Sequence, residues 1–161
     1  MVFRRLSALV LGLSLLAGGA AGAQTPSPPV AGAQSPSDFL AANAKAAGVQ
    51  VLPSGLQYKV VSTGPAGPSP KIGDVIKVSY EGTLLSGQVF DSTATHGRPA
   101  IMQLYDLVPG WMEALPLMHV GDEWILYVPP ALGYGDQATG PIPAGSVLVF
   151  KLKLLGMLSA D

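Results

Sequence analysis

The sequence predicts an α+β domain in which one antiparallel sheet packs against one short helix. In four segments, at residues 56–60, 76–81, 124–128 and 148–154, side chains expected to face a core alternate with side chains expected to face outward. Gly- and Pro-containing turns separate these segments, and only one stretch among them has helical character. The chain has 161 residues, 48% of them hydrophobic, which suits one domain with a core and extensions.

The loops and the helix of this domain are predicted from local signals. Residues 63–73 contain several Pro and Gly and are expected to form a loop. Residues 85–88 (LSGQ) are expected to form a hairpin turn that leads into Val89 and Phe90. The helix is expected to begin near Pro109, a favoured first-turn residue, and Pro116 limits its extension.

The N-terminus has the features of a secretory signal peptide. Arg4 and Arg5 precede an uncharged apolar run over residues 6–16, and residues 21–23 (AGA) match an A-x-A cleavage site. We therefore expect residues 1–23 to be removed and the mature chain to be periplasmic or secreted. The alternative is an uncleaved membrane anchor, which the short apolar core disfavours. The AGAQ string recurs at residues 31–34 and offers a second cleavage position.

The segment between signal and sheet divides into two parts. Residues 24–36 are rich in Pro, Ser, Ala and Gly and are expected to form a flexible linker. Within residues 37–51, Ser37 is expected to cap a short helix that starts at Phe39 and ends before Gly48. Phe39 and Leu40 are its expected anchors, and residues 52–161 are expected to form the main domain.

Composition excludes several classes of function. The absence of Cys excludes disulfides, thiolate catalysis and Cys-ligated zinc. The formal net charge of -1 and the lack of a basic stripe argue against nucleic acid as a partner. His96 and His119 lack metal or triad spacing and are expected to be solvent-exposed, and Asp122 and Glu123 are expected to be solvated. No cofactor is expected.

Aromatic residues occur in five distinctive strings of the second half of the chain. The strings are VSYEGTL with Tyr80, VFDST with Phe90 and Asp91, LVPGWMEAL with Trp111, PPALGYG with Tyr134, and SVLVFKLKLL with Phe150. Because no conventional nucleophile accompanies them, any chemistry is expected from a shaped apolar pocket with a few polar groups.

In order and spacing, these strings resemble the FKBP-type peptidyl-prolyl cis-trans isomerases over about residues 52–155. The upstream FLAANAKAAGV and QVLPSGLQYKV resemble the secreted bacterial, macrophage infectivity potentiator-like branch. The resemblance implies a sheet wrapped around the short helix and a non-covalent isomerase of X–Pro bonds that assists protein folding. It also implies proline-containing polypeptides as partners and macrolides as inhibitors.

Oligomeric state and membrane attachment are inferred by contrast with that branch. Many of its members carry a long helical dimerisation region, whereas one short helix and a linker occupy that place here. We therefore expect a monomer, with no stable membrane anchor after signal cleavage.

The resemblance assigns roles to eight residues. Trp111 would form the pocket floor, and the walls would be Tyr80, Phe90, Val108, Ile142 and Phe150. The Val108 N–H and the Tyr134 hydroxyl would donate hydrogen bonds to the ligand. Asp91 would lie at the pocket edge, facing the prolyl carbonyl or bonded to Tyr80.

Other interpretations of these residues stay open. Trp111 alone is more typical of a core residue than of a ligand platform, and Asp91 is equally suited to cap the following turn through Ser92 and Thr93. Many family members have an Arg bonded to the Asp, whereas this sequence has His96 at that position, with Arg98 nearby. The loop at residues 135–141 also resembles the family's loop less closely, so only Ile142 is assigned there.

Two other functions remain possible from the sequence. One is a peptide-binding chaperone module that uses the same groove with little turnover. The other is an envelope or host-interaction protein for which isomerisation is incidental.

Overall fold

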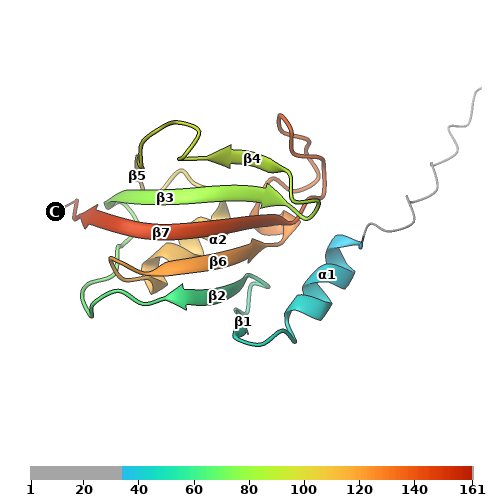
Figure 1. The fold of residues 1–161 in the computed structure, drawn as a ribbon, viewed down its shortest axis with the longest axis horizontal. Helices are drawn as coiled ribbons and strands as arrows, with labels where there is room; N and C mark the ends of the chain where they lie inside the picture. The colour runs from blue at the N-terminus through green and yellow to red at the C-terminus, as the bar shows by residue number, and fades with distance from the viewer. Residues whose placement is uncertain (1–33, 161) are drawn as a thin grey trace, which may run out of the picture. The chain divides into compact units, whose positions relative to one another are not determined.

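Seven strands form one antiparallel sheet in this computed structural model, which describes residues 34–160. The strands are β1 (Val49–Val51), β2 (Gln57–Ser62), β3 (Val75–Leu84), β4 (Val89–Ser92), β5 (Ala100–Gln103), β6 (Glu123–Val128) and β7 (Leu148–Leu158). Their spatial order is β1-β2-β6-β7-β3-β4, and β5 also pairs with β3. The helix α2 (Pro109–Ala114) lies against one face of this sheet (Figure 1). The predicted α+β fold class is therefore confirmed.

The two long strands β3 and β7 form the centre of the sheet. They pair antiparallel from Val75 opposite Leu158 to Leu84 opposite Leu148. On the face toward α2, Ile76, Val78, Leu152 and Leu154 are fully buried. Along β6, Trp124, Leu126 and Val128 are buried in the same alternating pattern. Period-two patterning thus predicted the buried face correctly, because one face packs on the core and the other does not.

The helix α2 begins at Pro109 as predicted and continues into the 3-10 turn η1 (Leu115–Leu117), which contains Pro116. Trp111, Ala114 and Leu115 face the sheet and are buried. The helix approaches the sheet closely at Gly110, where an added Cβ would lie 2.9 Å from a Val128 methyl group. A second 3-10 turn, η2 (Pro130–Leu132), follows β6. Among residues 34–160, no helix has the length and apolar character needed to cross a membrane.

The N-terminal helix α1 (Pro36–Asn43) differs from its prediction at both ends. Its N-cap is Ser35, whose hydroxyl oxygen accepts the Asp38 N–H at 3.1 Å. The assignment of Ser37 as N-cap was wrong, because Pro36 has no N–H to leave unsatisfied and is favoured as the first helical residue. The helix also ends at Asn43 instead of reaching residue 47, and Gly48 lies in the following turn with a φ of 79°.

Gln57 of β2 anchors the C-terminal end of α1 to the sheet. Its side chain lies on the outward face of the alternating pattern at residues 56–60 but is only 4% exposed. Its amide nitrogen donates to the Leu40 carbonyl at 2.9 Å, and its amide oxygen accepts from Asn43 at 2.8 Å. A side chain of the sheet therefore satisfies the last turn of α1 and fixes the helix on the outer face. The Phe39 ring packs there against Tyr127, with centroids 6.0 Å apart.

The prediction that Asp122 is solvated was also wrong, since this residue is only 3% exposed. Its two carboxylate oxygens accept the Gly64 N–H at 2.6 Å and the His119 N–H at 2.9 Å. The backbone around Gly64 packs so closely that an added Cβ would lie 2.2 Å from the Val120 carbonyl oxygen. Asp122 thus ties the loop at residues 63–73 to the turn before β6.

Candidate functional site

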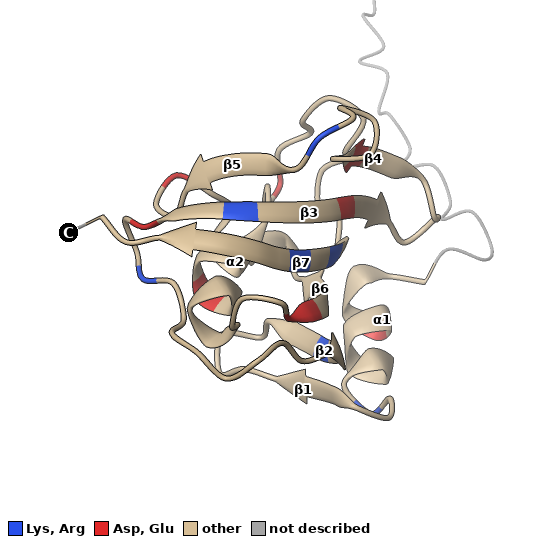
Figure 2. Ribbon diagram, turned by 60° about the vertical axis from the view of Figure 1, so that its left-hand side comes forward, with Lys and Arg blue, Asp and Glu red and all other residues tan. Residues whose placement is uncertain are grey.

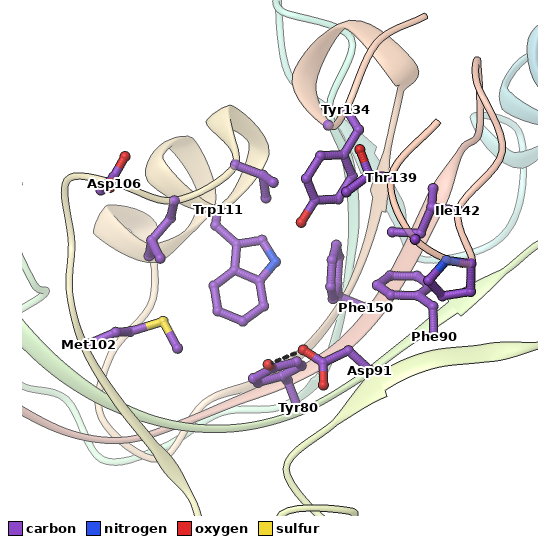
Figure 3. Close-up of a pocket in the computed structure, with 15 residues that line it drawn as sticks. Tyr80, Phe90, Asp91, Met102, Asp106, Trp111, Tyr134, Thr139, Ile142 and Phe150 are labelled. Carbon is purple, nitrogen blue, oxygen red and sulfur yellow. Dashed lines mark hydrogen bonds between the residues drawn. The ribbon is translucent and has the colours of Figure 1, made fainter. Parts of the chain in front are cut away.

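A pocket of about 600 Å³ opens between α2, the sheet and the long connections that flank β5 and β6 (Figure 3). All eight residues assigned from the sequence line this one pocket. They are Tyr80 of β3, Phe90 and Asp91 of β4, Val108 and Trp111 at the start of α2, Tyr134 and Ile142 of the connection from β6 to β7, and Phe150 of β7. The fold therefore gathers residues from five separate segments of the chain.

Four aromatic rings form the floor and one side of the pocket. Trp111 is only 4% exposed and stands nearly perpendicular to Tyr80 at 5.0 Å and to Phe150 at 5.2 Å. Phe90 meets Phe150 at 5.5 Å in the same T-shaped manner. Edge-to-face contacts of this kind fix each ring in one orientation, so the pocket has a rigid apolar shape. The Trp111 Nε1–H is buried and has no hydrogen-bond acceptor in the described part of the chain.

The glycine at position 82 of β3 makes room for two of these rings. A Cβ at Gly82 would lie 2.6 Å from the Phe90 ring and 2.9 Å from the Phe150 ring. Both rings therefore rest on the backbone of β3, where any side chain would displace them. The sequence alone indicates no role for Gly82, because a glycine within a strand pattern has many explanations.

Asp91 lies at the pocket edge in a network of three hydrogen bonds. Its Oδ2 accepts from the Tyr80 hydroxyl at 2.5 Å, a contact drawn as a dashed line in Figure 3. Its Oδ1 accepts the Ser92 N–H at 2.8 Å and lies 3.1 Å from His96 Nε2. The carboxylate thus bonds to Tyr80 and also caps the turn that follows it. The His96 side chain is 61% exposed, and it lies beside the carboxylate, at the position that corresponds by resemblance to the family's Arg.

These contacts shift two ionisation equilibria in opposite directions. Burial of the Asp91 carboxyl opposes its ionisation, but the hydrogen bonds from Tyr80, His96 and Ser92 outweigh burial and lower its pKa. Burial raises the pKa of the Tyr80 hydroxyl, and the bond to Asp91 raises it further. Tyr80 therefore remains a protonated donor, and Asp91 an ionised acceptor, at neutral pH.

The lowered pKa of Asp91 predicts an acid-dependent loss of stability. The ionised carboxylate stabilises the folded state above its ordinary pKa of about 4, and this contribution is lost as the pH falls through the lowered folded-state pKa. We expect the wild-type protein to exceed Asp91→Asn in free energy of unfolding at pH 6, by a margin that shrinks below pH about 4. Urea unfolding of both proteins between pH 6 and pH 2 measures this difference in unfolding free energy. A margin that is constant over this range would contradict the prediction.

Two hydrogen-bond donors of the pocket have no partner within residues 34–160. The Tyr134 hydroxyl makes no hydrogen bond there and points into the pocket from its rim (Figure 3). The Val108 N–H immediately before α2 likewise donates to no acceptor there, although the Val108 carbonyl accepts from Trp111 at 2.9 Å. Both donors are therefore free to bind a ligand.

The pocket includes lining residues that the sequence analysis did not assign. They are Met102, Asp106, Leu107, Gly133, Thr139, Gly140 and Pro141. Met102 belongs to β5, which at four residues was too short to be predicted from its pattern. Thr139, Gly140 and Pro141 belong to the loop where the sequence resembles the family least. Among the described residues, no group of three His, Asp or Glu side chains is arranged to hold a metal ion.

Comparison with known proteins assigns this fold and pocket to a family. Residues 67–155, more than half of the chain, match the model of the FKBP-type peptidyl-prolyl cis-trans isomerases. The chain belongs to this family. Residues 30–60 also match the model of the domain that lies amino-terminal to FKBP-type peptidyl-prolyl isomerases.

Individual FKBP relatives agree with this assignment. The chain is 46% identical over 123 residues to the outer membrane protein MIP of Legionella longbeachae, covering 76% of this chain and 52% of that protein. It is also 46% identical over 120 residues to the FKBP-type isomerase FkpA of Aeromonas hydrophila, covering 74% of this chain and 44% of that protein. The crystal structure of FkpA from Escherichia coli aligns with a TM-score of 0.74 at 37% identity, covering 78% of this chain and 59% of that chain. The chain thus spans about half the length of these FKBP relatives.

Proposed function

We propose that this chain is a peptidyl-prolyl cis-trans isomerase that accelerates X–Pro isomerisation during protein folding, without covalent chemistry. The observation that carries the proposal is the convergence of eight family-type residues on one rigid aromatic pocket with two free donors at its rim. Family membership supports the same conclusion.

The chemical problem is a barrier to rotation about the amide bond. An X–Pro bond interconverts over about 18–20 kcal/mol, because twisting the amide removes its resonance. The planar amide carries more charge separation than the twisted one, so an apolar site destabilises the planar state relative to the twisted state. Preferential binding of the twisted state is sufficient for catalysis. A thousandfold acceleration requires only about 4 kcal/mol of such preference.

The residues of the pocket suit these requirements. The indole of Trp111 offers an apolar floor for the pyrrolidine ring, and Phe90 and Phe150 enclose it. The Val108 N–H and the Tyr134 hydroxyl are placed to hold the carbonyls that flank the twisting bond. Tyr80 and Asp91 hold each other at the pocket edge, and no step requires a proton transfer from either.

The cellular context is proposed from the N-terminus and from the relatives. Residues 1–23 have the features of an export signal, and one relative carries the name outer membrane protein. We propose that the mature protein acts in the periplasm or outside the cell, as a monomer, on proline-containing polypeptides. Residues 52–161 would form the isomerase domain, and macrolides of the kind that bind this family would occupy its pocket.

The test of this proposal is the exchange rate of a short peptide with a hydrophobic residue before proline, catalysed by purified protein of residues 24–161. Fast exchange that a macrolide blocks supports the isomerase. Macrolide binding without exchange would instead indicate a peptide-binding module that uses the same groove. If the folded protein showed neither peptide exchange nor macrolide binding, the assignment of the pocket as a ligand site would be wrong.

Removing the Tyr134 hydroxyl tests one donor of the proposed mechanism. We expect Tyr134→Phe to lower kcat/KM about 3- to 10-fold, since a neutral hydrogen bond contributes about 0.5–1.5 kcal/mol. Stability should change little, because this side chain is 41% exposed and its hydroxyl bonds to no described residue. Tyr105→Phe, at a tyrosine that is 56% exposed and outside the pocket lining, is the matched control. Equal activity of the two variants would exclude a role for the Tyr134 hydroxyl.

A further inference from the structure

A second groove, of about 690 Å³, lies beside the proline pocket between β3, β5 and the connection from β4 to β5. The mechanism proposed above does not use it. Its lining combines three basic side chains with a hydroxyl and a short apolar wall: Lys77, His96, Arg98, Thr93, Pro99, Ala100 and Ile101, with Tyr80. Figure 2 shows Lys and Arg positions in blue on β3 and on the loop above it.

Lys77 and Arg98 lack acidic partners in the part of the chain that the structure describes, whereas His96 of the same groove contacts the Asp91 carboxylate at 3.1 Å. Within residues 34–160, neither Lys77 nor Arg98 lies within 4.0 Å of a carboxylate oxygen, whereas Lys151 and Lys153 both pair with Glu123. The formal net charge of the chain is -1, so this local excess of positive charge opposes the overall balance. Unpaired cations that line one groove attract a negatively charged group.

The local backbone keeps Lys77 accessible. Its partner on β7 is Gly156, which has no side chain to cover it, and its partner on β5 is Ile101. Ile101 is 71% exposed and supplies an apolar surface in the same groove. The combination of a cation with a neighbouring apolar wall suits a side chain with methylene groups and a terminal carboxylate.

The groove adjoins the proline pocket through one shared residue and one side-chain contact. Tyr80 borders both hollows, and His96, which lines the groove, contacts Asp91, which lines the pocket, at 3.1 Å. An extended polypeptide advances about 3.3–3.6 Å per residue, so a chain seated in the pocket reaches the groove within a few residues.

We propose that this groove is a subsite for an acidic side chain of the client polypeptide, within a few residues of the bound proline. Lys77 and Arg98 would bind the carboxylate, and Ile101 would contact the aliphatic part of the same side chain. The inference rests on the proposed isomerase function, and it adds a preference for prolines with a nearby Glu or Asp.

The test uses peptides that differ only in carrying Glu, Gln or Lys at one position, two to four residues to either side of the proline. We expect kcat/KM to be about 3- to 10-fold higher for Glu than for Gln at one of these positions, and lower for Lys, at low ionic strength. The preference should decrease in 0.5 M salt, because the contacts are exposed. In the double variant Lys77→Gln/Arg98→Gln, the Glu-to-Gln ratio should fall to about one.

The matched control is Lys45→Gln/Lys59→Gln, which removes the same charge from two exposed positions outside the groove. It should retain the preference, which separates a local subsite from a general effect of net charge. A wild-type ratio of one at every position, or an unchanged ratio in the Lys77 and Arg98 variant, overturns the subsite. Turnover of the Gln peptide tests isomerase function separately, and calorimetric binding of the same peptides tests the groove even without turnover.

Discussion

Replacing Trp111 with Leu is expected to reduce the proposed isomerase activity by at least about tenfold, equivalent to about 1.4 kcal/mol of transition-state binding. The indole forms the pocket floor and holds the Tyr80 and Phe150 rings through T-shaped contacts at 5.0 and 5.2 Å. Leucine retains an apolar floor but loses both the flat surface and these contacts. It also leaves a smaller cavity than alanine, so the variant should remain folded, below the cost of about 3–5 kcal/mol for complete truncation.

The second of the two tryptophans in the chain, Trp124, provides a matched control for this substitution. Trp124 is 5% exposed and stacks on Tyr58 with centroids 4.4 Å apart, but it does not line the pocket. Trp124→Leu should therefore lower the unfolding free energy while retaining kcat/KM. Peptide turnover and urea unfolding of both variants separate the two effects. Full activity in Trp111→Leu would show that the indole belongs to the core alone.

Introducing one methyl group at Gly82 is expected to abolish most of the activity. The new Cβ would lie 2.6 Å from the Phe90 ring and 2.9 Å from the Phe150 ring, closer than non-bonded carbon atoms approach each other. Both rings must move away from β3, and both are walls of the pocket. We expect Gly82→Ala to lose about 1–3 kcal/mol of stability through overpacking, and to lose macrolide binding together with turnover.

Gly156→Ala on the adjacent strand β7 is the control for Gly82→Ala. A Cβ at Gly156 would meet only the Lys77 Cβ, at 3.9 Å, which is an ordinary contact. The backbone of neither glycine has a positive φ, so alanine fits both conformations. Unfolding measurements and macrolide titrations should therefore show near wild-type behaviour for Gly156→Ala alone. Normal turnover in Gly82→Ala would mean that the two rings are not fixed by the β3 backbone.

The sequence by itself determined the fold class and indicated eight residues that the structure brings together in one pocket. Alternation along residues 76–81, 124–128 and 148–154 identified the buried face, because a strand with one buried side must repeat every second residue. The aromatic strings around Tyr80, Trp111 and Phe150 pointed to the pocket through their resemblance to a family, since each string is local and can be recognised in one dimension. The start of α2 at Pro109 was likewise set by a local signal.

Tertiary structure alone decided the features that depend on partners distant in the chain. Asp122 was expected to be solvated and Gln57 lies on the outward face of its strand, yet both are buried, because the backbone of Gly64 and α1 supply their hydrogen bonds. The role of Gly82 depends on rings from β4 and β7 that meet above it. The basic groove at Lys77 and Arg98 likewise forms only when β3 meets the connection from β4 to β5. Local patterns encode which face of a strand is buried, but the satisfaction of a buried polar group or the space beside a glycine is set by non-local neighbours.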